Sequence, residues 1–246
     1  MRAEPVMGTV ITVDVRDPGF SVDVIDAALR WFHRVDETFS TYRADSEIRR
    51  LARGEIGIEA CSEDVREVLR RCDDMRVRSN GCFDINYGEE LDPSGLVKGW
   101  SVERAAMMLQ AAGARNFFIN AGGDVIARGA PEPGRRWRLG IRHPERADSV
   151  AAVLAISDIA VATSGLYERG DHIVDPRTHA TPRSLVSMTV AGPSITDADA
   201  YATAAFVMGE PGAAWVAAID GYDVLAITAD HRVLSSAGMD ALRAVD

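Results

Sequence analysis

In the first third of the chain, apolar and polar residues follow the period of a strand and then that of a helix. Gly8 to Val15 alternates and is rich in β-branched residues, which predicts a strand. Ser21 to Phe39 carries apolar residues every three or four positions, which predicts a long amphipathic helix. Asp45-Ser46 predicts the start of a short helix, and Ser62 to Val77 predicts another helix, capped by its serine.

The stretch from Leu91 to Gly129 contains the helix around which we expect the rest to be organised. It reads LDPSGLVKGWSVERAAMMLQAAGARNFFINAGGDVIARG. Apolar residues between Trp100 and Ala112 form one helical face, and Gly113 marks a turn. Asn116 to Ala127 then changes to a strand-like run.

The second half of the chain is predicted to contain strands with two helices between them. Arg136 to His143, Val150 to Ile156 and Ile159 to Thr163 are three strand-like runs, consistent with an antiparallel meander. The remaining predicted elements are a strand at Leu185–Ala191, helices at Thr196–Met208 and Gly212–Ile219, and a hairpin of Tyr222–Thr228 with Arg232–Ser235.

These elements predict an α+β fold. Strands and helices are interleaved without strict alternation, and the sequence has no internal repeat and no low-complexity tract. A chain of 246 residues with 47% hydrophobic content can bury a substantial core. We therefore expect a single mixed domain over residues 1–246.

Composition and charge exclude several classes of protein. The net charge of −10 argues against a nucleic-acid binder, although one anionic ligand could bind in a locally basic pocket. Cys61, Cys72 and Cys82 have no CxxC spacing, and we interpret them as reduced thiols. No run is long enough for a transmembrane helix, and no signal peptide or lipid-accepting cysteine is visible at the start. We expect a cytoplasmic protein; an export segment removed from the chain would leave no mark on this sequence.

Two features of the central stretch allow a functional or a purely structural interpretation. Lys98 is predicted in the first turn of its helix, where the helix dipole disfavours a cation. An anion such as phosphate beside it would explain the position, and a salt bridge to Asp92 or Glu103 is the alternative. Gly122-Gly123, before Asp124, indicates either a β-bulge or a close backbone approach, and local physics favours the bulge.

A carboxylate and a hydroxyl share one face of the helix predicted from Thr196. Asp199 and Thr203 are one turn apart. Together they offer oxygen ligands for a hard cation such as Mg²⁺, with water, backbone carbonyls and phosphate oxygens completing the site. The alternative is structural, because Thr196-x-x-Asp199 matches a capping box.

Three further residues are candidates for chemistry. His172 lies beside carboxylates in a polar loop and could be a general base, or only a surface residue. Tyr42 could stack on a flat ring, or could be a half-buried anchor of its loop. Ser164 lacks the GxSxG context of a hydrolase nucleophile, and we reject that role. The chain also has no Walker A loop and no GxGxxG.

Eight short motifs, taken in order, carry a family resemblance. Together they resemble the ApbE-type FAD:protein FMN transferases over about residues 7–209. The motifs are MGT at Met7–Thr9, FSTYRADSEI at Phe39–Ile48, GCFD at Gly81–Asp84, LDPSGLVKGWSVER at Leu91–Arg104, NAGGD at Asn120–Asp124, ATSGLYER at 162–169, HIVDPRT at 172–178 and DADAYATAAFVMG at Asp197–Gly209.

The resemblance implies a largely antiparallel sheet flanked by helices, and a Mg²⁺-dependent enzyme that uses FAD as its substrate. Such an enzyme transfers the FMN part of FAD to a threonine hydroxyl of an acceptor flavoprotein and releases AMP. Two alternatives are a Mg²⁺-dependent FAD pyrophosphatase, which gives FMN and AMP, and a non-catalytic FAD-binding protein.

The resemblance also implies roles for individual residues. The Gly95 carbonyl with Asp199 and Thr203 would hold Mg²⁺, and His172 would be the base. The residues expected along FAD are Met7, Tyr42, Cys82, Phe83, Asp84, Asp92, Lys98 and, on the strand Ser187–Val190, Met188. With an anionic pyrophosphate in place, the metal interpretation of Asp199 and Thr203 is favoured over capping, and both can hold at once.

The sequence departs from the family pattern at three points. His179 stands where the family's PRTG turn has glycine, and its side chain could reshape the entrance for the acceptor. Glu103 stands where the family usually has aspartate, and we expect it to serve packing. The segment YGEE before Leu91 is short, so the loop over the ligand is short.

Overall fold

The computed structural model describes the whole chain except residues 88–89, 145, 147–148, 167–172 and 245–246. Its centre is an eight-stranded sheet in which every described pair of neighbouring strands is antiparallel. The strands, in spatial order, are β1 (Arg2–Val6), β2 (Thr9–Val15), β5 (Phe117–Ala121), β6 (Asp124–Arg128), β9 (Ala160–Gly165), β10 (Leu185–Gly192), β11 (Asp223–Thr228) and β12 (Val233–Ser235).

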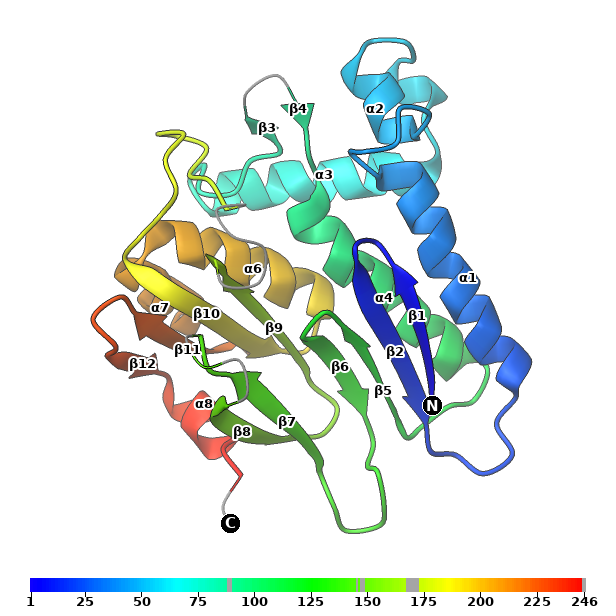
Figure 1. Ribbon diagram of the computed structural model, residues 1–246, viewed down its shortest axis with the longest axis vertical. Coiled ribbons are helices and arrows are strands. Elements are labelled where there is room, and N and C mark those ends of the chain that lie inside the picture. The colour runs from blue at the N-terminus through cyan, green and yellow to red at the C-terminus, as the bar shows by residue number, and fades with distance from the viewer. Residues whose placement is uncertain (88–89, 145, 147–148, 167–172, 245–246) are drawn as a thin grey trace.

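Helices cover one face of this sheet (Figure 1). Helix α4 packs between α1 and α6, and α6 also packs on β9 and β10. The helices on this side are α1 (Val22–Phe39), α3 (Glu63–Arg78), α4 (Ser94–Ala111), α6 (Ile195–Met208) and α7 (Glu210–Ala217), with the short α2 (Glu47–Ala52), a 3₁₀ turn at Ile58–Ala60 and a small hairpin of β3 (Asn86–Tyr87) and β4 (Glu90–Leu91) beyond their ends.

A smaller layer covers the opposite face. It consists of a separate two-stranded sheet, β7 (Trp137–Arg142) with β8 (Val150–Ile156), and the short helix α8 (Ala237–Ala241). The sheet therefore has two cores. Along β6, Ile126 belongs to the core under the helices, whereas Val125 and Ala127 belong to the core under β7, β8 and α8. This alternation is what a strand buried on both faces requires.

Helices α4 and α6 approach each other closely because glycine lies at their crossing. A Cβ atom at Gly99 would lie 2.6 Å from the carbonyl oxygen of Ile195 and 2.9 Å from Cβ of Asp199. Any side chain at Gly99 would therefore force the helices apart. This crossing sets the position of the site described below.

The α+β fold predicted from the pattern is confirmed, and the main helices lie where the periodicity places them. Ser46 and Ser62 are the N-cap residues of α2 and α3, and each side chain accepts a backbone N–H. The long helix predicted from Ser21 begins at Val22, with Ser21 at its N-cap position. Cys61, Cys72 and Cys82 are free and buried.

The predicted antiparallel meander is wrong. Strand β8 pairs with β7, whereas β9 returns to the main sheet between β6 and β10. The physical reason is burial: Trp137, Leu154 and Ile156 of the β7–β8 hairpin pack on Val125 and Val161, an apolar face that the main sheet would otherwise expose to water.

The β-bulge favoured for Gly122-Gly123 is also wrong. Ala121 pairs with Asp124, so the two glycines form the two-residue turn of the β5–β6 hairpin. Both have positive φ values, 61° and 99°, which suit a tight hairpin turn and favour glycine. A Cβ at Gly122 would lie 2.5 Å from Oγ1 of Thr9, so this turn also packs closely on β2.

The length and hydropathy of the helices test the expectation that no segment crosses a membrane. No helix among the described residues combines the length and the apolar character needed to cross a membrane.

Candidate functional site

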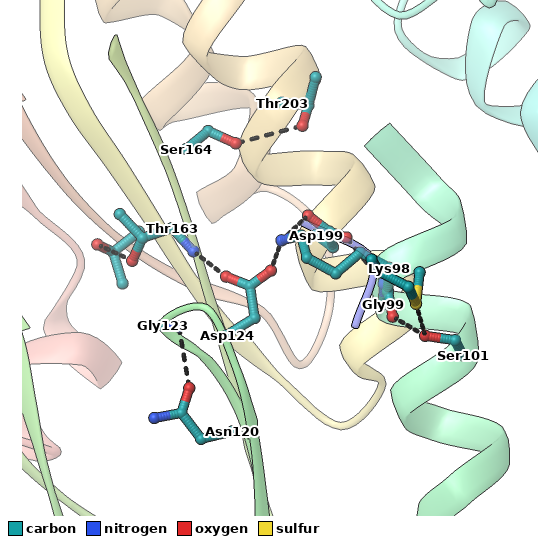
Figure 2. Close-up of polar contacts among 12 residues, drawn as sticks. Lys98, Gly99, Ser101, Asn120, Gly123, Asp124, Thr163, Ser164, Asp199 and Thr203 are labelled. Atoms are coloured by element: carbon teal, nitrogen blue, oxygen red, sulfur yellow. Dashed lines mark hydrogen bonds and ion pairs between the residues drawn. The ribbon is translucent and has the colours of Figure 1, made fainter. Parts of the chain in front are cut away.

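One ammonium group and two carboxylates meet where α4, α6 and β6 come together (Figure 2). Nζ of Lys98 on α4 lies 3.0 Å from Oδ1 of Asp199 on α6 and also contacts Oδ2 of Asp124 on β6. The Lys98 side chain is 26% exposed, while the two carboxylate side chains are 1% and 5% exposed. Three distant parts of the sequence therefore form one buried charge cluster.

Each carboxylate also accepts one backbone hydrogen bond. The N–H of Gly99 donates to Oδ2 of Asp199 at 2.9 Å. The N–H of Thr163 on β9 donates to Oδ1 of Asp124 at 2.9 Å. Oδ2 of Asp124 accepts no hydrogen bond from the described residues, so its contact with the Lys98 ammonium is the ion pair that balances it.

A second contact between α4 and α6 lies one turn along each helix. A Cβ at Gly95 would lie 3.6 Å from Cγ2 of Thr203 and 3.1 Å from the ring of Phe83. Gly95 is therefore beside Thr203, as Gly99 is beside Asp199. Oγ1 of Thr203 also lies 3.2 Å from Oγ of Ser164 on β9 (Figure 2). The structure thus brings together Gly95, Asp199 and Thr203.

These three residues fit a hard divalent cation. They offer a carboxylate, a hydroxyl and the backbone carbonyl of a helix start, and all three are oxygen donors of the kind that Mg²⁺ prefers. Within the described part of the chain, no three His, Cys, Asp or Glu side chains gather as a metal site. A cation here would therefore rely on hydroxyl, backbone and substrate oxygens.

The capping interpretation of Thr196 and Asp199 is wrong. The N-cap of α6 is Ser194, whose Oγ accepts the N–H of Asp197 at 3.2 Å. The Asp199 carboxylate faces α4 and does not cap its own helix.

Glu103 of α4 ties the start of α6 in place. Its Oε2 accepts hydrogen bonds from Oγ of Ser194 at 2.5 Å, and from the N–H and Oγ1 of Thr196 at 3.1 and 2.7 Å. A carboxylate at a helix N-terminus satisfies free donors and matches the helix dipole. Glu103 thus does more than fill space between the two helices.

Lys98 does not lie where the sequence predicted. Helix α4 begins at Ser94, so Lys98 is beyond the first turn. The predicted salt bridge to Asp92 or Glu103 is wrong, because Oδ1 of Asp92 accepts the N–H of Ser94 at 2.9 Å and Glu103 is bonded to α6. Acids from elsewhere in the fold are the true partners.

The residues expected along FAD lie on several elements and differ in burial. Sδ of Met7 lies 3.9 Å from Oγ of Ser101, one turn after Lys98. Tyr42 is 98% exposed, so it is not the half-buried loop anchor considered above. Met188 on β10 is fully buried.

Asp84 borders a cavity of about 270 Å³ between α3 and the β3–β4 hairpin. Its Oδ1 accepts the N–H of Asn86 at 2.9 Å. Burial raises the pKa of the nearby Cys72 thiol, and the negative charges of Asp92 and Asp84 raise it further. Cys82 and Phe83, which precede Asp84, are buried in the main core. The cavity is lined by Leu69, Cys72, Asp73, Arg76, Asp84, Ile85, Asn86 and Leu91.

His172, the predicted base, lies outside the described residues. The loop that follows it is held by Arg177, whose Nε and a terminal nitrogen donate to the two oxygens of Asp175 at 2.9 and 2.8 Å. These hydrogen bonds hold the pKa of Asp175 below its usual value. His179 has a φ of 58°, the left-handed region that glycine adopts without strain, which explains why glycine suits this position.

Sequence reasoning missed Asp124, Gly99 and the hydrogen-bonding role of Glu103. The signal for Asp124 was present: it is an acid directly after a two-glycine turn, in an otherwise apolar strand. Such an acid is buried in the sheet and requires a partner.

A family model and several named relatives match the sequence of this chain. A family model described as "ApbE family" matches residues 7–91 and 86–226. The FAD:protein FMN transferase of Treponema pallidum (strain Nichols) is 32% identical over 211 residues, which cover 74% of this chain and 58% of that protein. That of Rhodobacter capsulatus is 36% identical over 183 residues, 70% of this chain and 35% of that protein. The chain thus spans little more than half of the first relative and about a third of the second.

Solved structures agree with the fold. The flavin transferase ApbE from Vibrio cholerae superposes with a TM-score of 0.85 at 25% identity, and the match covers 98% of each chain. The ApbE protein from Thermotoga maritima gives a TM-score of 0.88 at 22% identity over 99% of each chain, which supports the fold alone.

Proposed function

The chain belongs to the ApbE family, and from that premise we propose that it transfers the FMN part of FAD to a threonine hydroxyl of an acceptor protein, in a Mg²⁺-dependent reaction that releases AMP. The name of these relatives, FAD:protein FMN transferase, supports the flavin substrate and the protein acceptor. The Mg²⁺ requirement and the threonine are the parts that this proposal adds.

One observation carries the proposal: the crossing of α4 and α6 sets Gly95 beside Thr203 and Gly99 beside Asp199, with the Lys98 ammonium at the same place. This provides oxygen donors for a cation and a positive charge for an anion within a few ångströms of each other. FAD contains both features that such a site suits, because its pyrophosphate is anionic and binds divalent cations.

The proposed reaction exchanges the phosphoanhydride bond of the FAD pyrophosphate for a phosphoester bond to threonine. The threonine oxygen forms a bond to the phosphorus on the FMN side, and the bond from that phosphorus to the bridging oxygen breaks. AMP leaves with the bridging oxygen. The hydroxyl proton passes to a base, for which His172 is the candidate. In-line placement of the two oxygens supplies much of the rate.

The residues of the chain divide this work. The Gly95 carbonyl, Asp199 and Thr203 would hold Mg²⁺, which when bound neutralises charge on the pyrophosphate as its bond breaks. Lys98 adds a second positive charge and orients the same phosphates. Met7, Tyr42, Cys82 to Asp84, Asp92 and Met188 remain the proposed contacts of FAD.

Chromatography of the nucleotide products tests this proposal. With FAD, Mg²⁺ and a threonine-bearing acceptor domain, we expect AMP to accumulate without an equal amount of free FMN. Omitting the acceptor, or chelating the metal with EDTA, should stop AMP release. Equal amounts of FMN and AMP with or without the acceptor would contradict the transferase and indicate hydrolysis.

A further inference from the structure

The two carboxylates at Lys98 do not depend on it equally. Asp199 keeps a backbone hydrogen bond from Gly99 on one oxygen, and its other oxygen faces Lys98. Asp124 has one oxygen bonded to the Thr163 N–H, while the one partner of its other oxygen in the described part of the chain is the ammonium. A buried carboxylate without a partner is strongly unfavourable. The Lys98 ammonium therefore cannot move away from Asp124 unless another cation takes its place.

Asp199 is also the carboxylate on the metal side of the cluster. It lies on α6 one turn from Thr203, whereas Asp124 lies on β6, with Lys98 between the two acids (Figure 2). A lysine ammonium at Asp199 and a divalent cation at Asp199 repel each other at short distance. The oxygen of Asp199 that faces Lys98 can therefore bind either the ammonium or the divalent cation at full strength, but not both.

We propose that Asp124 is a positioning residue that holds the Lys98 ammonium, so that Asp199 is available to a divalent cation. Lysine has a flexible stem and three donors, so its ammonium can shift toward Asp124 with a small side-chain rotation. Lys98 is then a resident cation that competes with the metal at Asp199, and Asp124 sets the strength of that competition. This inference rests on the proposed function, because it concerns the same metal site.

A double-mutant cycle measures the competition directly. The probe is Mn²⁺ alone, with no FAD and no acceptor, and its dissociation constant is measured by electron paramagnetic resonance. The proteins are the wild type, Asp124→Asn, Lys98→Met and the double variant Lys98→Met/Asp124→Asn. The double variant removes both charges of the pair together, so it leaves no buried charge of that pair unbalanced.

The expected results differ in sign. Asp124→Asn should weaken Mn²⁺ binding by about 3- to 10-fold, because Lys98 then rests on Asp199 alone. Lys98→Met should tighten it by about 10-fold, the scale that one nearby charge produces. In the Lys98→Met background, Asp124→Asn should change the Mn²⁺ affinity by less than about 2-fold, because Asp124 acts through the lysine.

Two outcomes overturn the positioning role. An equal weakening by Asp124→Asn in both backgrounds would show a simple field effect of the charge. A larger weakening in the Lys98→Met background would make Asp124 a direct ligand of the metal. Weaker Mn²⁺ binding in Asp124→Asn alone, with tighter binding in Lys98→Met and in the double variant, supports it.

Asp14→Asn is the matched control. Asp14, on β2, is another buried carboxylate, 3% exposed, and it pairs with the basic residue Arg16. Its replacement should leave the Mn²⁺ affinity unchanged. Absence of Mn²⁺ binding in all of these proteins, or additive effects of the two substitutions, would overturn this inference. The Mg²⁺ dependence of the proposed function is decided separately, by AMP release from FAD with and without EDTA.

Discussion

At the residue scale, the site depends on a few buried charges whose partners come from distant parts of the chain. Lys98 reaches Asp124 on β6 and Asp199 on α6, and each acid is further fixed by one backbone N–H. Removal of one partner from a buried ion pair of this kind strongly destabilises the folded protein. Each member can therefore be tested singly, with activity and stability read separately.

Replacing Asp199 by alanine tests the metal assignment. We expect Asp199→Ala to lower the rate of FMN transfer by at least about 100-fold, the scale seen when one preorganised electrostatic contact is removed. FAD binding, measured by fluorescence quenching, should weaken less. Asp197→Asn is a control on the same helix, because Asp197 binds the hydroxyl of Tyr222. Normal turnover of Asp199→Ala at limiting Mg²⁺ would show that the assignment is wrong.

The Asp175–Arg177 pair predicts a pH dependence of stability. The pKa of Asp175 is lowered in the folded state, chiefly by the Arg177 hydrogen bond, from its ordinary value of 3.8. A lowered pKa contributes stability that is present above the unfolded value and lost as the pH falls through the folded value. The free energy of unfolding of the wild type should therefore exceed that of Asp175→Asn by a constant amount above about pH 5.

Below pH 3.8 that difference should shrink. Urea unfolding of both proteins between pH 2.5 and about pH 7 measures it. A difference that grows on acidification would contradict the assignment of this ion pair.

At the scale of elements, the crossing of α4 and α6 builds the site. Gly95 and Gly99 leave one side of α4 without side chains, so α6 packs directly against it. Thr203 then lies beside Gly95, and Asp199 lies beside Gly99. Glu103 fixes the start of α6 one turn further along.

The glycine at the crossing should be intolerant of even one methyl group. Gly→Ala inside a helix normally stabilises by about 1 kcal/mol. Here the added Cβ would lie 2.6 Å from a backbone oxygen, so we expect Gly99→Ala to destabilise the protein by about 1–3 kcal/mol. Gln110→Ala, at an exposed position of the same helix, should change the free energy of unfolding by less than about 0.5 kcal/mol. A stabilised Gly99→Ala protein in urea unfolding would rule out the close crossing.

The elements themselves were largely predictable, whereas their contacts were not. The apolar period of Ser21 to Phe39 and the serine before α3 locate those helices because both signals are local. The partners of Lys98 are not local, since Asp124 and Asp199 reach it only after β6 and α6 have packed. The predicted strand order is wrong for the same reason. Strand β9 pairs with β6 and β10, while β7 and β8 form a separate hairpin that buries an apolar face of the main sheet, and the pattern of β9 itself carries no signal for this.

At the scale of the molecule, a single sheet joins the two halves of the chain. Its neighbouring strands come from both ends of the sequence, from β1 and β2 to β11 and β12. The helices cover one face and the β7–β8 hairpin covers the other. The site lies on the helix side, where α4 and α6 meet strands β6 and β9 (Figure 2).

This architecture predicts that the 246-residue chain unfolds as one cooperative domain. Leu154 is fully buried in the core under the β7–β8 hairpin, so Leu154→Ala should destabilise the protein by about 2–5 kcal/mol. Tryptophan fluorescence and circular dichroism should report the same shifted urea transition, because Trp31 and Trp100 lie at the other core and Trp137 at this one. Two separate transitions would contradict a single domain.

Mass spectrometry of an acceptor domain tests the central claim most directly. The domain is incubated with this protein, FAD and Mg²⁺, then digested and sequenced by fragmentation. The account predicts a mass gain equal to FMN less one water, located on a threonine, and no gain when that threonine is replaced by alanine. An acceptor of unchanged mass, with free FMN and AMP in solution for two unrelated acceptor sequences, would contradict it.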